Sequence, residues 1–219
     1  MMLNVPRTMK DLSTREHRAT MLREPHISPL TDYVHRLRSR DDNEYPYFDP
    51  ADGGINATIA FLFEKPGPMT VPTGRDRRSG SGFISRDNDD PTAEATYEFF
   101  QKAEIKREHT VLWNTVAGWN GTRAIKRHEL VGGVADLRDL FGLLPKLQVV
   151  VLVGKKAEKA EALVSEIPDI EVFKSPHPSP LVRVSHPEQW NSIPAIWTAA
   201  GERAQQLGER RIQENLGSS

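Results

Sequence analysis

The segment 175–181 has the composition of a rigid loop that presents polar side chains. It reads Ser-Pro-His-Pro-Ser-Pro-Leu and follows a short run of β-forming residues at 170–173. Proline fixes its own φ angle and restricts the residue before it, so the prolines largely set the backbone path. Such a loop would hold the imidazole of His177, the hydroxyl of Ser179 and the apolar side chain of Leu181 in fixed positions. In isolation, the pattern favours a proline-punctuated turn with an incidental histidine.

Two further segments place polar residues directly after apolar runs. Residues 64–68 read Glu-Lys-Pro-Gly-Pro, and Asn114 lies near the end of a second apolar run. A loop rich in proline and glycine at the carboxyl end of a buried strand is the usual place for a binding site in an α/β sheet. A carboxamide offers a donor and an acceptor on one planar group, which suits recognition of a flat polar molecule. Taken alone, Asn114 could also cap the end of its strand.

Four apolar runs have the composition of buried strands, and they cover residues 58–63, 110–116, 147–153 and 170–173. Helices are expected from Pro91 after an Asp90 N-cap, over 134–144 and 155–167, and from Pro187 to a frayed tail at Gln213. This alternation predicts an α/β fold, a three-layer α/β/α sandwich with a central four-stranded parallel sheet. The three polar segments would then follow the carboxyl ends of parallel strands.

The chain is expected to contain one folded domain. Residues 1–27 are polar and mixed in charge, which is typical of a mobile or loosely packed lead-in. A helix should begin at Ser28, with Pro29 at its first position and an apolar face that includes Tyr33. Residues 28–219 show no internal repeat and no further domain boundary, so they are interpreted as a single α/β domain.

Composition narrows the possible chemistry. The 219 residues contain no cysteine, which excludes disulfides, thiol nucleophiles and cysteine-ligated metal clusters. The histidines form no convincing metal-ligand spacing, so neither a metal nor another cofactor is expected. The net charge is −1, so contact with nucleic acid would need a local basic patch. No run is long enough to span a membrane, and the start lacks the apolar core of a signal peptide; we expect a cytoplasmic monomer.

Residues 55–200 resemble the uracil-DNA glycosylase superfamily in four motifs. The run Val-Leu-Trp-Asn-Thr-Val at 111–116 and His-Pro-Ser-Pro-Leu at 177–181 resemble motifs of the family-one enzymes. Residues 64–68 resemble the water-activating motif, in the Glu-x-Pro-Gly form of the iron–sulfur branch rather than the Gln-Asp-Pro-Tyr form. Phe83, within Ser-Gly-Phe-Ile-Ser, stands where the family carries a base-stacking phenylalanine.

The resemblance implies roles in excising a base that has been flipped out of DNA. His177 would stabilise the departing base and Glu64 would position or activate water. Phe83 would stack on the base and Asn114 would pair with its edge. Gly67 replaces a tyrosine that excludes the methyl group of thymine in family one, so discrimination against thymine would be weaker.

Contacts with the DNA backbone and helix are implied for further residues. Ser179 would bind a phosphate and Leu181 would wedge into the gap left by the base. The basic loop 122–128 would contact phosphates through Arg123, Lys126 and Arg127, or it is a solvated charged loop. Its last residue, His128, loosely matches a histidine that traps the sugar covalently in one branch. Four arginines elsewhere could track a phosphate backbone or lie in a solvated loop: Arg75, Arg77, Arg78 and Arg86.

Two departures from the family pattern affect the chemistry. Lys65 stands where family one has an aspartate, and an ammonium group cannot do what a carboxylate does. Lys65 could bind a phosphate, attack the sugar as an amine, or point to solvent. The iron–sulfur branch normally carries four cysteines, and this chain has none, so packing must replace the cluster.

Two functions from different classes therefore remain open. The first is a glycosylase that hydrolyses the N-glycosidic bond of uracil or a related deaminated base in DNA. The second is a catalytically impaired module of the same fold that binds nucleic acid or a free nucleobase. The two share a pocket, so convergence of Glu64, Phe83, Asn114 and His177 on one cavity is the first structural test.

Overall fold

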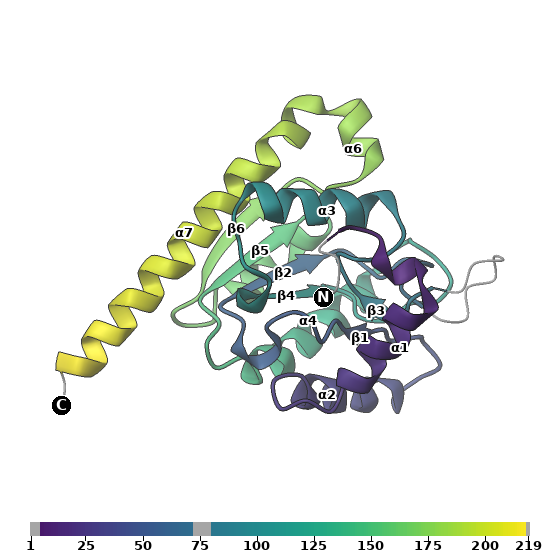
Figure 1. Cartoon of the computed structure of the whole chain (residues 1–219), viewed down its shortest axis with the longest axis horizontal. Coiled ribbons are helices and arrows are strands. Elements are labelled where there is room, and N and C mark those ends of the chain that lie inside the picture. Colours follow the sequence, from purple (N-terminus) through teal and green to yellow (C-terminus); the bar gives the residue numbers. More distant parts are fainter. Residues whose placement is uncertain (1–4, 72–79, 218–219) are drawn as a thin grey trace.

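The computed structural model describes residues 5–71 and 80–217 and is built on a four-stranded parallel sheet (Figure 1). The strands are β2 (Ile59–Phe63), β4 (Thr110–Asn114), β5 (Val149–Val153) and β6 (Glu171–Ser175). Their order across the sheet is β4-β2-β5-β6, and every neighbouring pair is parallel. All residues of β4 and β5 are buried, as expected for central strands covered on both faces. The predicted four-stranded parallel sheet is confirmed.

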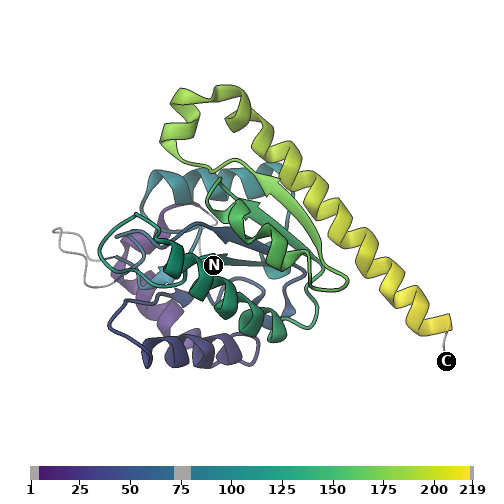
Figure 2. The ribbon, with the colours of Figure 1, turned by 180° about the vertical axis from the view of Figure 1, so that it is seen from behind.

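Helices cover both faces of this sheet (Figures 1 and 2). On one face lie α3 (Pro91–Lys102) and α7 (Pro187–Gly217), where the rings of Phe61, Phe100 and Trp197 meet at centroid distances of 4.6–4.9 Å. On the other face lies α4 (Arg127–Gly142), which buries Leu137 and Leu140. The molecule is thus the three-layer α/β/α sandwich that the alternation of strands and helices predicts.

Local sequence signals set most helix starts. The Asp90 side chain accepts hydrogen bonds from the backbone N–H groups of Thr92 (2.9 Å) and Ala93 (3.1 Å), which caps α3 as predicted. Helix α2 (Ser28–Arg38) begins at the expected residue and buries Tyr33.

Four helix predictions need correction. The segment 155–167 forms only the 3₁₀ turn η4 (Ala157–Ala160) and the single-turn α5 (Glu161–Val164). A helix that was not predicted, α6 (Pro180–Ser185), precedes α7, because Ser179 can cap it and Pro180 occupies its first turn. Helix α4 begins at Arg127, inside the predicted loop. Helix α7 continues past Gln213 to Gly217, and its carboxyl-terminal half extends beyond the sheet in both views (Figures 1 and 2).

A second, two-stranded parallel sheet lies beside the β4 edge. It pairs β1 (Tyr47–Phe48) with β3 (Phe83–Ile84) in the register Tyr47↔Phe83 and Phe48↔Ile84. The 3₁₀ turns η2 (Gly54–Asn56) and η3 (Arg107–His109) precede β2 and β4. The ring of Phe48 stacks on Trp113 of β4 at 3.8 Å, so the small sheet packs directly on the main one.

Residues 5–27 are not a loosely packed lead-in. They form the 3₁₀ turn η1 (Thr8–Lys10) and helix α1 (Leu12–Met21), and Met9 and Ile27 are buried. The guanidinium of Arg18 is buried and pairs with Asp49 (3.1 Å) and Asp87 (3.0 Å). The polar composition misled the prediction because the anchor is an ion pair to residues far along the chain, which a local pattern cannot show.

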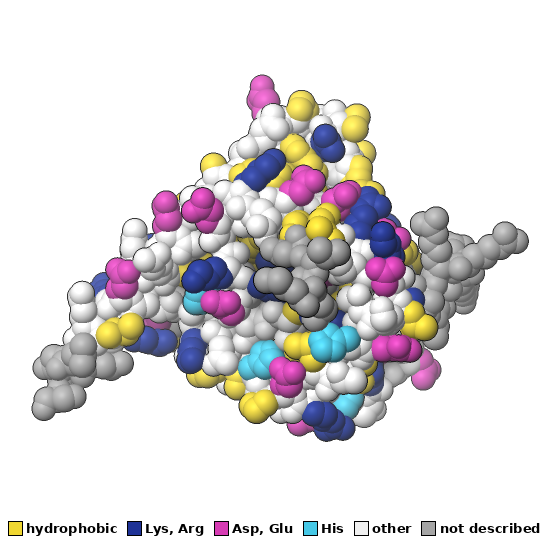
Figure 3. Space-filling view, viewed as in Figure 1, with side chains coloured by type: hydrophobic (Ala, Val, Ile, Leu, Met, Phe, Trp, Pro, Cys, Tyr) yellow, Lys and Arg dark blue, Asp and Glu magenta, His cyan; other side chains and the backbone are white. Residues whose placement is uncertain are grey.

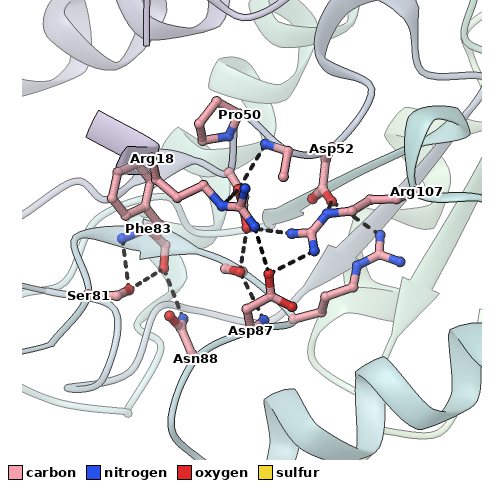
Figure 4. Close-up of polar contacts among 12 residues, drawn as sticks. Arg18, Pro50, Asp52, Ser81, Phe83, Asp87, Asn88 and Arg107 are labelled. Atoms are coloured by element: carbon pink, nitrogen blue, oxygen red, sulfur yellow. Dashed lines mark hydrogen bonds and ion pairs between the residues drawn. The ribbon is translucent and has the colours of Figure 1, made fainter. Parts of the chain in front are cut away.

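Arg18 belongs to a buried group of three arginines and three aspartates, here called the arginine–aspartate cluster (Figure 4). Its members are Arg18, Asp49, Asp52, Arg86, Asp87 and Arg107. Arg107 contacts all three aspartates, at 2.5 Å (Asp49), 2.8 Å (Asp52) and 2.7 Å (Asp87). The cluster joins α1, the loop after β1, the turn after β3 and η3.

Burial and charge pairing compete within the cluster. Burial disfavours the charge on Arg107 and on Asp49, but attraction between opposite charges outweighs it, so the pKa of Arg107 is raised and that of Asp49 is lowered. For Asp52 burial wins and raises the pKa to about 6, and for Arg86 it lowers the pKa to about 10. Arg86 also lies over the ring of Phe100 at 3.7 Å. Arg86 is therefore a buried structural residue and not a phosphate contact, while Arg75, Arg77 and Arg78 lie outside the described residues.

Within the described residues, no helix is long and apolar enough to cross a membrane.

Candidate functional site

A pocket of about 1080 Å³ lies at the carboxyl ends of the parallel strands. Glu64 follows β2, Asn114 ends β4, Gly154 follows β5 and His177 follows β6, and all four line this pocket. In-register parallel pairing, such as Phe63↔Asn114 and Leu62↔Leu152, brings these strand ends to one edge. Three of the four residues proposed from the sequence as its core thus converge on one cavity.

Glu64 and His177 meet around Gly154. A Cβ atom at Gly154 would lie 2.9 Å from Oε1 of Glu64 and 3.2 Å from Cβ and Cδ2 of His177. Gly154 has a φ of +95°, which favours glycine. The missing side chain and the positive φ therefore let the carboxylate and the imidazole approach the end of β5 together.

The carboxylate of Glu64 is held by Lys156. Its Oε1 accepts a hydrogen bond from the backbone N–H of Lys156 at 3.2 Å, and its Oε2 lies 3.3 Å from Nζ of the same residue. The Glu64 side chain is 23 % exposed and that of Lys156 is 46 % exposed. Both oxygen atoms of Glu64 therefore have a defined partner at the pocket wall.

His177 is neutral over a wider pH range than a free histidine. Burial lowers its pKa below 6.5, Glu64 opposes this shift, and the positive charges of Lys156 and Arg123 add to it. The ring packs edge-on against Phe63, with centroids 5.9 Å apart. A neutral imidazole can donate one hydrogen bond and accept another, so either role is open to His177 at pH 7.

Asn114 has an unused donor. Its side chain is 4 % exposed, and its Nδ2 finds no hydrogen-bond partner among the described residues. A buried polar group without a partner is costly, so native structures retain one chiefly where it has a task. Asn114 lines the pocket, so this donor is available to a molecule that enters it.

The structure does not place Phe83 with the other three residues. Its ring is 4 % exposed and packs against Tyr47, with centroids 6.2 Å apart, and Phe83 is not among the described residues that line the pocket. Its strand partner is also Tyr47 in the β1–β3 pairing. The next residues, Ile84 and Ser85, do line the pocket, and so does Phe63. The predicted stacking on Phe83 is therefore wrong for this arrangement.

Lys65 is neither exposed nor free to contact DNA. Its side chain is 2 % exposed, and Nζ donates to Glu129 Oε1 (2.6 Å), Asn120 Oδ1 (2.8 Å) and the Ala124 carbonyl (3.2 Å). Burial opposes the negative charge on Glu129, but the hydrogen bond from Lys65 contributes to a lowered pKa. Lys65 thus ties the loop after β2 to the start of α4, which corrects the three roles considered for it.

The basic loop divides into two parts. Arg123 is exposed and lines the pocket, and its contact with a DNA phosphate stays a prediction. Lys126, Arg127 and His128 are exposed at the start of α4 and are not among the described lining residues. His128 is therefore not placed to attack a sugar in the pocket. Lys126 and Arg127 remain predictions as outer phosphate contacts.

The proline-rich loop leads into an exposed apolar tip. Ser179 lines the pocket and its hydroxyl accepts from the Val182 N–H at 3.4 Å, so it caps α6. Leu181 is 74 % exposed and Val184 is 82 % exposed, and Figure 3 shows hydrophobic side chains on the surface over α6. Gly67 also lines the pocket, and a Cβ there would meet nothing within 4 Å.

Comparison with protein families identifies the family to which the chain belongs. The model of the uracil DNA glycosylase superfamily matches residues 52–201, more than half of the chain. The chain belongs to the uracil DNA glycosylase superfamily. Membership supports a glycosylase-type hydrolase and DNA as the partner. A comparison with curated proteins found no match.

The iron–sulfur cluster of one branch of the superfamily does not fit this member. Such clusters need cysteine ligands, and the chain has no cysteine. In this chain, Arg18 ties helix α1 to Asp49 and Asp87 of the arginine–aspartate cluster.

The sequence reasoning missed three residues of the pocket. Lys156 and Gly154 follow β5, a strand whose end was not treated as part of the site, although Gly-Lys-Lys after an apolar run was a visible signal. Asn88 also lines the pocket, where its Nδ2 donates to the Phe83 carbonyl at 3.0 Å. Nothing in the local sequence distinguished Asn88 from other turn residues.

Proposed function

We propose that this protein is a monofunctional DNA glycosylase that hydrolyses the N-glycosidic bond of uracil or a related deaminated base. The observation that supports it is the meeting of Glu64, Asn114 and His177, from three separate strand ends, in one pocket. Superfamily membership supports the same reaction class and DNA as the substrate.

His177 is the proposed stabiliser of the leaving base. When the bond between base and sugar breaks, its electron pair stays with the base, and negative charge develops on the base carbonyls. A neutral imidazole N–H pointed at such an oxygen stabilises this charge. The lowered pKa of His177 suits that role, because the ring remains neutral at pH 7.

Glu64 is the proposed partner of the attacking water. Loss of the base leaves positive character on the sugar carbon. The water oxygen bonds to this carbon and gives up a proton, and the base anion takes up one proton, so the products are the neutral base and a sugar with a hydroxyl group. A carboxylate at the pocket wall can orient that water and attract the developing positive charge. With Lys65 buried against Glu129, Glu64 is the carboxylate that this motif offers to the pocket.

Asn114 is the proposed reader of the base edge. Its free Nδ2 would donate to a carbonyl oxygen, and its Oδ1 would accept from a ring N–H. Uracil and other deaminated bases present this pattern of acceptor and donor. The open space at Gly67 favours tolerance of substituents that a bulky residue would exclude.

The DNA would lie across the mouth of the pocket. Arg123 is placed for a phosphate, and Leu181 and Val184 offer an apolar tip that could fill the gap left by the flipped base. Ser179 could bind a phosphate at the same end of the pocket.

The test is release of free base from single- and double-stranded oligonucleotides that carry one lesion each: uracil, hypoxanthine, xanthine or a thymine mismatch. We expect release of at least one of these bases without strand cleavage. His177→Ala should reduce the rate by about 10²–10³, the typical effect of removing one charge-stabilising donor. Wild-type protein that is folded but releases none of these bases would refute the proposal.

A second candidate is a module that binds nucleic acid or a nucleobase without cleaving it. It is favoured by two observations: Lys65 occupies the position of the family-one carboxylate, and Glu64 is paired with Lys156. This candidate predicts tight binding of lesion-containing oligonucleotide with no abasic product.

A further inference from the structure

Lys156 is the charged group closest to Glu64, and it contacts both carboxylate oxygens. The backbone N–H reaches Oε1 at 3.2 Å and the ammonium lies 3.3 Å from Oε2. A residue that grips one carboxylate from two directions fixes the orientation of its plane. The backbone contact is possible because Gly154, two residues earlier, turns the chain back toward Glu64 with its positive φ.

We infer that Lys156 is a positioning residue: it fixes the Glu64 carboxylate and balances its charge, so that His177 opposite remains neutral. The catalytic consequence rests on the proposed function, but the geometry and its effect on His177 do not.

Three charged side chains act on the protonation of His177. Glu64 alone would attract a proton to the imidazole, because a nearby negative charge favours the charged form of histidine. Lys156 places a positive charge against the same carboxylate and so opposes this effect. Arg123, from the loop after β4, acts in the same direction. Without Lys156, the pair of Glu64 and His177 would share one proton more readily.

Other charged side chains that line the pocket are engaged elsewhere. Lys65 pairs with Glu129 and Asp90 caps α3. The remaining three are Lys155, Glu158 and Lys174. Lys155 pairs with Glu158 at 3.4 Å, and Lys174 pairs with Glu161, which does not line the pocket, at 2.6 Å. Lys156 is thus the described ammonium that bonds to the proposed water-orienting carboxylate.

The distribution of side-chain exposure supports the assignment. Lys155, its chain neighbour, is 86 % exposed, whereas Lys156 is 46 % exposed and inclined toward the pocket wall. Two adjacent lysines thus differ in environment, which provides a matched control.

The test is a nuclear magnetic resonance titration of the His177 ring in the full chain. The His177 signal is assigned by its loss in His177→Gln. In Lys156→Met we expect the pKa of His177 to rise by roughly 0.5–1 unit. A neighbouring opposite charge, here that of Glu64, changes a pKa by about 1–3 units. The substitution removes one of the two cations, Lys156 and Arg123, that oppose the effect of Glu64 on His177. Lys156→Arg should restore most of the shift, and Lys155→Met should leave the titration at the wild-type position.

The same variants are then assayed for base release as a function of pH. Lys156→Met should lower the rate at pH 7 and move the acidic limb of the profile to higher pH, whereas Lys156→Arg should retain the wild-type limb. A His177 titration in Lys156→Met that superimposes on that of the wild type would overturn the inference, as would a profile that changes in height alone. If no variant and no wild type releases a base but the His177 shift is present, the proposed function fails and the inference stands.

A covalent role for Lys156 gives a different result. If the amine attacked the sugar, borohydride reduction during turnover would trap a protein–DNA adduct that Lys156→Arg abolishes. We expect no such adduct, because Nζ of Lys156 is engaged in its ion pair with the Glu64 carboxylate. A trapped adduct through Lys156 would contradict the positioning role.

Discussion

The arginine–aspartate cluster and the pocket both gather polar side chains, but these side chains are satisfied in different ways. The arginine–aspartate cluster balances three positive and three negative charges internally (Figure 4). The pocket, in contrast, holds an amide nitrogen of Asn114 that has no partner among the described residues, and a half-buried His177 whose pKa is lowered by burial. The ion pairs of the cluster connect separate structural elements, whereas the pocket has hydrogen-bond donors that a ligand could use.

One residue connects the two regions. Ser85 lines the pocket, and its hydroxyl donates a hydrogen bond to Asp49 of the cluster at 2.5 Å. The cluster thereby supports one wall of the pocket. This difference predicts that substitutions in the cluster reduce stability first, whereas substitutions in the pocket reduce activity and leave stability almost unchanged.

The largest effect on stability is expected for Arg107→Met. The substitution leaves Asp49, Asp52 and Asp87 with fewer positive partners, and breaking a buried ion pair in this way costs about 3–5 kcal/mol. Urea unfolding followed by circular dichroism measures the free energy of unfolding. The control is Arg138→Met, which removes an exposed pair with Glu166 and should cost at most about 1 kcal/mol. Equal losses in the two variants would contradict a structural role for the cluster.

Asn114→Ala should reduce activity strongly and stability little, the opposite of the effect expected for Arg107→Met. It removes a buried donor that has no protein partner, so the free energy of unfolding should change little. Base release should fall by about 10²–10³, corresponding to about 2.7–4 kcal/mol of transition-state stabilisation. Single-turnover release and urea unfolding are measured on the same preparation. A variant that loses stability but keeps its activity would assign Asn114 to the scaffold.

Gly154→Ala should affect both properties moderately. A Cβ atom would lie 2.9 Å from Oε1 of Glu64, and the φ of +95° is strained for alanine. Strain of this kind costs about 1–3 kcal/mol, and the displaced carboxylate should reduce base release. Gly132→Ala is the control, because a Cβ there meets nothing within 4 Å. If Gly154→Ala matches the control in both measurements, the close approach of Glu64 and His177 is not required.

The smallest expected effect is a pH dependence of stability that comes from His177. Its folded pKa is lowered, so as pH falls through 6.5 the unfolded chain takes up a proton that the folded protein does not. The destabilisation by His177 therefore grows as pH falls from 6.5 to the lower folded pKa, keeps its full size below that pKa, and is absent well above 6.5. The difference in unfolding free energy between wild type and His177→Gln, measured at pH 7.5 and 5.5, should shift toward the variant at pH 5.5. A difference that is independent of pH would contradict the lowered pKa.

The parts of the structure that could be predicted from the sequence depend on local patterns. The strand Ile59–Phe63 is apolar throughout, and Asp90-Pro91 is a strong helix start, so both were predicted. The resemblance located Glu64, Asn114 and His177, because their motifs follow strand ends that the parallel sheet must bring together.

The errors come from long-range pairing. Arg18 finds its partners 31 and 69 residues away, and Lys65 finds Glu129 64 residues away. Phe83 is directed by its pairing with Tyr47, and not by the residues next to it. Lys156 was missed for the same reason, because its partner Glu64 lies 92 residues earlier. In each case a polar or aromatic side chain gains its role from a distant segment, which local composition does not specify.

The most direct test of the central claim is detection of free uracil by mass spectrometry after incubation of the full chain with a uracil-containing oligonucleotide. The account predicts stoichiometric release of uracil, or of hypoxanthine or xanthine from the matched lesion, with an abasic site left in an uncut strand. It also predicts that His177→Ala, folded as the wild type, loses nearly all of this release. Tight binding of the oligonucleotide with no free base from any of the lesions would contradict the claim.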